Sequence, residues 1–309
     1  MSEKGKAERE VLVPVWDKPE PYFEYTEIQK KRIVYIKNNP WRVISDNKRL
    51  ATHRQASTCE SLLNVYPEGI EIGSVAGTGE IFALGVFGTF IGFGASIALL
   101  LFEFSTFLGR MEKIDYIFAP VLLFVSIIFF LFGIMCLKMA FFMPRDFPTL
   151  FNRKTRQVSF RQVVPIPFWK FWRKGGASPV QTVPWEATKV RSYKFIEAPG
   201  GRVFRDMYLL RLLWEDPAQP HKLKYWMNIG YKGWWEDERL FRLWEHIRRY
   251  MEEDGPPIQP GETLRTTRYG KLPKFPAEVI AAAGGPAFSV EAVAALATPG
   301  AASFEDVGR

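Results

Sequence analysis

Two long uncharged stretches dominate the hydrophobic pattern in the first half of the chain. Residues 81–102 and residues 116–137 each run for twenty-two positions without a charged side chain. As a helix, either stretch would rise about 33 Å, which is enough to cross the ~30 Å hydrocarbon core of a bilayer. Soluble helices seldom stay uncharged over such a length. The pattern therefore predicts a transmembrane helical hairpin over residues 81–142.

The charges around these stretches predict their orientation. Only residues 103–115 separate the two stretches, whereas residues 138–174 carry nine Lys or Arg against a single acidic residue, Asp146. Basic residues collect on the cytoplasmic side of membrane proteins. Two spans return the chain to the side that it left, so we expect a multi-pass protein of the inner (plasma) membrane with both termini in the cytoplasm.

Small residues in the first stretch predict close helix packing. Gly88 and Gly92 have the GxxxG spacing, which lets two helix backbones approach each other. Packing against the second stretch of the same chain is the favoured interpretation. A face for a homodimer uses the same spacing, so a homo-oligomer stays open.

After residue 143 the pattern changes to short alternating runs that are broken by Pro and Gly. Residues 149–163, 183–195, 203–215 and 222–230 have the apolar alternation and the β-branched and aromatic content of strands. In the first run, residues 152–155 form a polar turn and predict a hairpin. We therefore expect an antiparallel sheet.

A helix is predicted to follow the strands. From about residue 234 to 251, apolar side chains recur at spacings of four, three and four, at Leu240, Trp244, Ile247 and Met251. Such a helix can cover the apolar face of a sheet. The predicted fold class is thus an integral membrane α-helical hairpin plus a cytoplasmic α+β domain over 143–257, in which an antiparallel sheet is capped by a C-terminal helix in a PH-like arrangement.

The two ends of the chain complete the predicted domain organisation. Residues 1–80 form a cytoplasmic N-terminal segment with short strands, and residues 62–74 resemble a hairpin. Because both termini are expected in one compartment, we hypothesise that these strands join the C-terminal sheet. Residues 258–309 are rich in Ala, Gly and Pro and predict a flexible tail.

The composition offers little catalytic chemistry. The chain has two Cys, three His and a net charge of +8, and it lacks P-loop, zincin and nucleophile-elbow motifs. His53, His221 and His246 are far apart in sequence, and His246 is expected on the solvated face of the predicted helix. We therefore expect no enzyme, no cofactor, no metal site and no nucleic-acid partner.

A basic segment just after the second apolar stretch is the main candidate surface. Tryptophans and cations alternate there, and both are favourable at an anionic membrane interface. Positive charge at this place is also what the topology alone requires, so the two explanations compete. The candidate membrane-surface contacts are Arg153, Lys154, Arg156, Trp169, Lys170, Trp172, Arg173 and Lys174.

The order of these parts resembles a known family. Residues 151–153 (Phe-Asn-Arg), residues 184–186 (Pro-Trp-Glu) and the segment 244–251 follow a two-span hairpin, and the similarity covers about residues 65–257. Together they resemble uncharacterised bacterial inner-membrane proteins with two transmembrane helices and a PH-like cytoplasmic domain, which are often encoded beside type VI secretion effectors. The resemblance implies an accessory role as an adaptor or immunity-like protein.

Three functions follow as hypotheses. The first is a non-enzymatic inner-membrane accessory protein whose cytoplasmic domain binds a partner protein, linked to a type VI secretion effector. The alternative is a scaffold that contacts membrane lipid through the basic surface of residues 153–174. The third is an enzyme whose site has no recognised motif.

Overall fold

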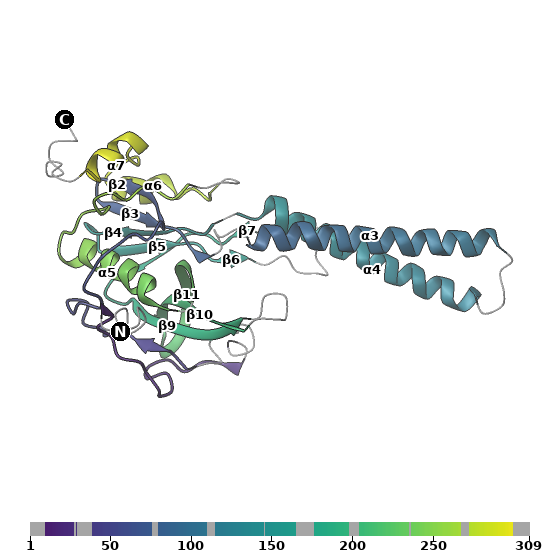
Figure 1. Cartoon of the computed structure of the whole chain (residues 1–309), viewed down its shortest axis with the longest axis horizontal. Helices are drawn as coiled ribbons and strands as arrows, with labels where there is room; N and C mark the ends of the chain where they lie inside the picture. The colour runs from purple at the N-terminus through teal and green to yellow at the C-terminus, as the bar shows by residue number, and fades with distance from the viewer. Residues whose placement is uncertain are drawn as a thin grey trace.

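A long helical hairpin projects from a β-rich domain (Figure 1). The computed structural model describes residues 10–27, 29, 39–75, 80–109, 115–144, 146–164, 176–197, 204–234, 236–266 and 272–298. The hairpin consists of α3 (Glu80–Leu108) and α4 (Asp115–Phe142). With 29 and 28 residues, the helices rise about 43 and 42 Å. Both are long and apolar enough to cross a membrane, over Phe82–Leu108 and Ile117–Phe142, slightly beyond the predicted spans.

The hairpin is inserted between two neighbouring strands of one sheet. This sheet has the order β2-β3-β4-β5-β8 and is antiparallel throughout. Its strands are β2 (Leu62–Tyr66), β3 (Gly69–Ile72), β4 (Thr149–Asn152), β5 (Gln157–Phe160) and β8 (Gln181–Pro184). In the β3–β4 pair, Ile72 lies opposite Thr149. The hypothesis that strands before the hairpin join those after it is therefore confirmed.

A second antiparallel sheet has the order β1-β9-β10-β11. It contains β1 (Arg42–Val43), β9 (Lys189–Glu197), β10 (Arg205–Asp216) and β11 (Gln219–Trp234), and a separate ladder joins β6 (Val163–Val164) to β7 (Gly176–Ala177). The sequence predicted a single sheet, whereas the described residues form a five-stranded, a four-stranded and a two-stranded sheet. Strand β10 is buried on both faces, because Leu213 packs with Phe23 of the N-terminal segment while Leu210 and Leu212 belong to the main core.

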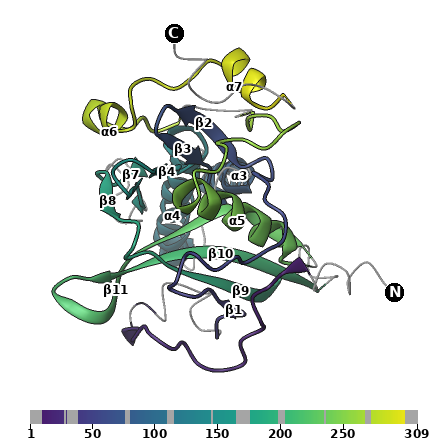
Figure 2. The same ribbon diagram turned by 90° about the vertical axis from the view of Figure 1, so that its left-hand side faces the viewer.

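Helix α5 (Glu238–Glu252) lies between the two sheets (Figure 2). The predicted apolar stripe is confirmed, since Leu240, Trp244, Ile247 and Met251 are all buried. The predicted start at residue 234 is wrong, because β11 continues to Trp234. Strand β11 passes close under the helix at Gly230, whose φ is +75° and where an added Cβ would lie 2.5 Å from the Leu243 side chain.

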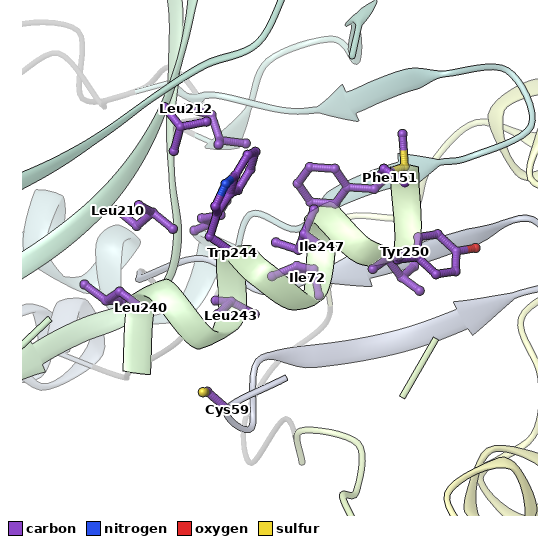
Figure 3. Packing of buried hydrophobic residues seen from close by; sticks show 14 of the residues in the cluster. Cys59, Ile72, Phe151, Leu210, Leu212, Leu240, Leu243, Trp244, Ile247 and Tyr250 are labelled. Carbon is purple, nitrogen blue, oxygen red and sulfur yellow. The ribbon is translucent and has the colours of Figure 1, made fainter. Parts of the chain in front are cut away.

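Aromatic contacts hold the sheets and α5 together. Figure 3 shows Trp244 and Ile247 on α5 between Leu212 of one sheet and Phe151 of the other. The ring of Trp185 joins these groups, with its centroid 5.4 Å from Trp244 and 6.0 Å from Phe151. One continuous core therefore includes both sheets.

The segment after α5 packs on the domain, in contrast to the predicted flexible tail over 258–309. Its described part contains α6 (Ala277–Ala282) and α7 (Val290–Leu296), and Val293 of α7 is buried in the main core. The backbone amide of Phe288 donates to the carbonyl of Val65. Small apolar residues here fit against the five-stranded sheet, which an Ala-rich composition does not reveal.

Candidate functional site

The surface of the hairpin is apolar along its length. Large side chains point outward from both helices, and among the most exposed are Leu84, Phe87, Phe90, Leu101, Phe107, Ile117, Phe124 and Phe142. A soluble protein rarely leaves such a continuous apolar surface uncovered. The hairpin is therefore a candidate site for contact with lipid.

Glycines form the contact between the two helices. A Cβ added to Gly92 would lie 2.6 Å from the Cα of Gly133, and one added to Gly88 would lie 2.6 Å from the Sγ of Cys136. Gly85 approaches the backbone of Ala140 in the same way. Both predicted packing glycines, Gly88 and Gly92, thus face α4 of the same chain, and this geometry favours the intrachain interpretation.

One pair of hydroxyl groups joins the helices near the middle of the hairpin. Ser96 and Ser126 are both buried, and their Oγ atoms lie 3.0 Å apart. The Ser126 hydroxyl also donates to the carbonyl oxygen of Ser96. These bonds satisfy polar groups in an apolar environment and fix the register of α3 on α4.

The two ends of the hairpin are tied together where they enter the domain. Asp146, just after α4, accepts hydrogen bonds of 2.7 Å from the backbone amide and from the hydroxyl of Ser74, just before α3. Arg265 pairs with the same carboxylate at 3.3 Å. Burial raises the pKa of Asp146, and the bonds from Ser74 and the charge of Arg265 oppose this rise.

Only the first part of the predicted basic surface of residues 153–174 lies among the described residues. Arg153, Lys154 and Arg156 lie in the β4–β5 turn, at the opposite end of β4 from the residues that lead into the hairpin. Arg153 pairs with Glu68 at 3.1 Å, and Arg156 is paired with Glu186 and Glu252. The first half of the candidate surface therefore points away from the hairpin and is largely neutralised.

The second half of that surface lies outside the described residues. Trp169, Lys170, Trp172, Arg173 and Lys174 belong to the segment 165–175. The strands on either side of it are β6 and β7, which lie at the end of the domain from which α3 and α4 project (Figure 1). Val163 and Val164 of β6 are 45% and 41% exposed.

The sequence motifs behind the family resemblance are occupied by core residues. Phe151, Trp185 and Trp244 are each almost fully buried and contact one another through their rings or through the common core. The indole of Trp185 donates to Glu252. These motifs therefore mark packing in this chain rather than chemistry.

A cavity of about 440 Å³ opens beside the end of β11 and the start of α5. It is lined by Cys59, Glu60, Ser61, Tyr231, Arg239, Thr263, Leu264, Arg265 and Thr266. Burial raises the pKa of the Cys59 thiol, so this sulfur is protonated at neutral pH and is a poor nucleophile. The cavity is rich in hydrogen-bond donors, and Arg265 connects it to the base of the hairpin through Asp146.

Helix α5 carries buried polar groups, among them His246, which was expected on a solvated face of the helix. His246 is 1% exposed, and burial lowers its pKa to about 4. The prediction of a solvated histidine is therefore wrong. Glu245 is fully buried, and although burial opposes its ionisation, bonds from Arg248, Thr52 and Arg249 hold its pKa below the usual range. These groups are therefore held within the fold by buried contacts.

One group of possible metal ligands comes from three distant segments. Single ligand atoms of Glu10, His53 and Glu238 all lie within 4.8 Å of one another. The sequence shows no metal-ligand spacing at these three positions, because the residues come together only in the fold. The bridge between Val11 and His53 brings the N-terminal segment beside the loop that joins β1 to β2.

Comparison with protein-family models, with curated proteins and with solved structures finds no match for this chain. The family resemblance described above therefore stays a prediction.

Proposed function

We propose that the protein is a non-enzymatic integral membrane protein whose hairpin of α3 and α4 holds the β domain against the inner face of the membrane. The observation that carries this proposal is the projecting hairpin with apolar side chains on its outside and glycines at its helix contact. A soluble hairpin has the reverse arrangement, because water drives large apolar groups inward.

Extraction from membranes tests the anchoring. The native chain is expected to stay with the membrane at alkaline pH in carbonate, whereas a peripheral protein is released. A double variant, Ile97→Arg with Ile127→Arg, places charges on exposed positions of both helices, and each costs about 2.5–3.5 kcal/mol near a helix centre. We expect this variant to be lost from the membrane fraction. Leu12→Arg, at an exposed position of the domain, is the control.

The geometry favours lipid contact by the segment 165–175 over the turn 153–156. The first is flanked by exposed valines at the hairpin end of the domain, while the arginines of the second already have carboxylate partners. Cations near an anionic leaflet gain about 1 kcal/mol each. This proposal narrows the alternative function, a lipid-contacting scaffold, to Trp169, Lys170, Trp172, Arg173 and Lys174.

A photoactivatable anionic lipid distinguishes the two segments in one sample. The full chain in vesicles is illuminated, digested and mapped by mass spectrometry. We expect lipid adducts on the peptide that contains residues 165–175 and far fewer on residues 153–156. Equal labelling of both segments, or labelling of the turn alone, contradicts the assignment.

The role as an adaptor or immunity-like protein for a type VI secretion effector stays a prediction, as does the PH-like classification. The domain has two antiparallel sheets around a helix, and a PH-like fold would have to share this arrangement. Purification in mild detergent with mass-spectrometric identification of bound proteins tests the partner. Recovery of the chain alone, from cells that contain the effector, counts against the adaptor role.

A further inference from the structure

We propose that Glu10, His53 and Glu238 form a binding site for a divalent transition-metal ion, with Zn²⁺ as the best fit. The site is independent of the membrane anchor. It would link the N-terminal segment, the loop around residue 53 and the first turn of α5.

The three ligand atoms face one another across a small gap. The Nε2 atom of His53 lies 4.0 Å from a carboxylate oxygen of Glu10 and 3.9 Å from one of Glu238. On a tetrahedral zinc ion, ligand atoms lie about 3.4 Å apart. The two pairs that include His53 therefore need to close by about half an ångström, and the two carboxylate oxygens, which lie within 4.8 Å of each other, by up to about 1.4 Å. Imidazole nitrogen and carboxylate oxygen are both zinc ligands, and three protein ligands leave a fourth position open.

The surroundings of the gap indicate a missing partner. The His53 side chain is fully buried, yet its Nε2 atom makes no hydrogen bond, and neither does the buried Oε2 atom of Glu10. The other ring nitrogen of His53 lies 2.9 Å from both the backbone amide nitrogen and the carbonyl oxygen of Gln55, so the tautomer decides which of the two it bonds. Donation of Nδ1–H to this oxygen would leave the Nε2 lone pair directed at the gap, as in most histidine ligands of metals.

Arg242 is the competing cation at this place. Its guanidinium lies 2.6 Å from Glu238 and 3.6 Å from Glu10. It makes no hydrogen bond to the Nε2 atom of His53, and its own Nε is also buried without a hydrogen bond. One guanidinium thus balances part of the charge of two carboxylates and leaves the histidine unsatisfied. The Glu238 oxygen that Arg242 holds is the same Oε1 that lies 3.9 Å from His53, so a metal ion at this place has to displace Arg242 from that oxygen.

Metal content of the full chain tests the site. The protein in detergent is stripped with a chelator, dialysed against micromolar Zn²⁺ and then against buffer, and bound zinc is measured by atomic emission. We expect one zinc per chain in the native protein. His53→Ala and Glu10→Gln should each weaken zinc binding by at least about 10–100-fold. That is the loss caused by removing a residue that only hydrogen-bonds to a metal ligand. His221→Ala, which removes an exposed histidine, is the matched control and should keep one zinc.

Cobalt keeps the test decisive if a variant folds poorly. Co²⁺ in the native chain should give the visible absorption of a four-coordinate site, and Zn²⁺ should displace it. Near-ultraviolet circular dichroism reports the folded tryptophan core of each variant. A native chain that binds no zinc and gives no cobalt spectrum overturns the proposal. Equal zinc affinity in folded His53→Ala and in His221→Ala overturns it as well.

Discussion

In the hairpin, large side chains such as Phe87 and Phe90 lie on the outside and Gly88 and Gly92 fill the contact between the helices. In the β domain, the arrangement is reversed, and Trp185 and Trp244 are buried at its centre. Water favours burial of apolar area in the domain, whereas in lipid the helices gain only from close backbone packing. The difference between the two regions is the one expected for a hairpin in lipid and a domain in water.

The largest expected difference between the two regions comes from replacing one aromatic residue in each by alanine. Trp244→Ala removes a ring that joins both sheets, and we expect it to lower the free energy of unfolding of the domain by about 3–5 kcal/mol. Phe90→Ala, at a position 74% exposed on the hairpin, should change it by less than ~0.5 kcal/mol. Chemical denaturation of the full chain in detergent, followed by near-ultraviolet circular dichroism, measures both. Similar losses in the two variants would contradict the contrast.

Acid should weaken the domain more than the hairpin. The pKa of His246 is lowered from 6.5 to about 4 by burial, so between these values the unfolded chain binds a proton that the folded chain does not. The contribution of this group to the free energy of unfolding is therefore fully present above pH 6.5. It falls by on the order of 3 kcal/mol as the pH drops toward 4. Burial lowers the pKa of His53 too, and this adds to the same trend.

Denaturation of the full chain in detergent at a series of pH values measures this loss. His246→Gln should flatten the profile in this range, and His221→Gln should keep the native one. The helical signal of the hairpin, whose contact rests on glycines and the Ser96–Ser126 pair, should stay constant. An unchanged slope in His246→Gln rules out this source of acid sensitivity.

A larger side chain at the helix contact should disrupt the hairpin. Gly92→Leu forces atoms against the backbone of Gly133, and overpacking of this kind costs about 1–3 kcal/mol. Gly94→Leu is the matched control, because nothing lies within 4 Å of a Cβ added there. Titration with sodium dodecyl sulfate in mixed micelles measures both. If the two variants are equally stable in this titration, the glycines do not determine the packing of α3 against α4.

The smallest expected effect concerns the hydroxyl pair of the hairpin. Ser96→Ala removes the bonds between the Ser96 and Ser126 hydroxyls and should cost about 0.6 kcal/mol, the average for such bonds in a membrane protein. Ser105→Ala, which removes only a bond within α3, is the control in the same titration. A loss above ~2 kcal/mol in Ser96→Ala would mean that polar bonds, rather than glycine packing, hold the hairpin.

The sequence predicts the local elements well. The hairpin, the β4–β5 turn and the apolar stripe of α5 each depend on residues that are close along the chain. The β3–β4 pairing could be hypothesised only because both flanks of the hairpin were expected in one compartment. The second sheet and the packed C-terminal segment were missed, because Leu213, Phe23 and Val293 find their partners far away in sequence.

The candidate sites were harder to predict. Arg153 and Arg156 look free in sequence, and only the fold brings Glu68, Glu186 and Glu252 to them. The group of Glu10, His53 and Glu238 has no sequence spacing to recognise. A helical projection of α5 places His246 beside Arg242 and Arg249, but the loop that buries it, with Gln259 against its ring, is invisible to periodicity.

Labelling of single cysteines tests the membrane topology most directly. Leu108→Cys lies at the exposed end of α3, Val290→Cys lies on the surface of the domain, and the native Cys59 and Cys136 are both buried. In intact cells whose outer barrier is permeable to a charged maleimide, the account predicts labelling of Leu108→Cys alone. Val290→Cys should react only after the inner membrane is opened. Equal labelling of both positions in intact cells would contradict a β domain on the inner face.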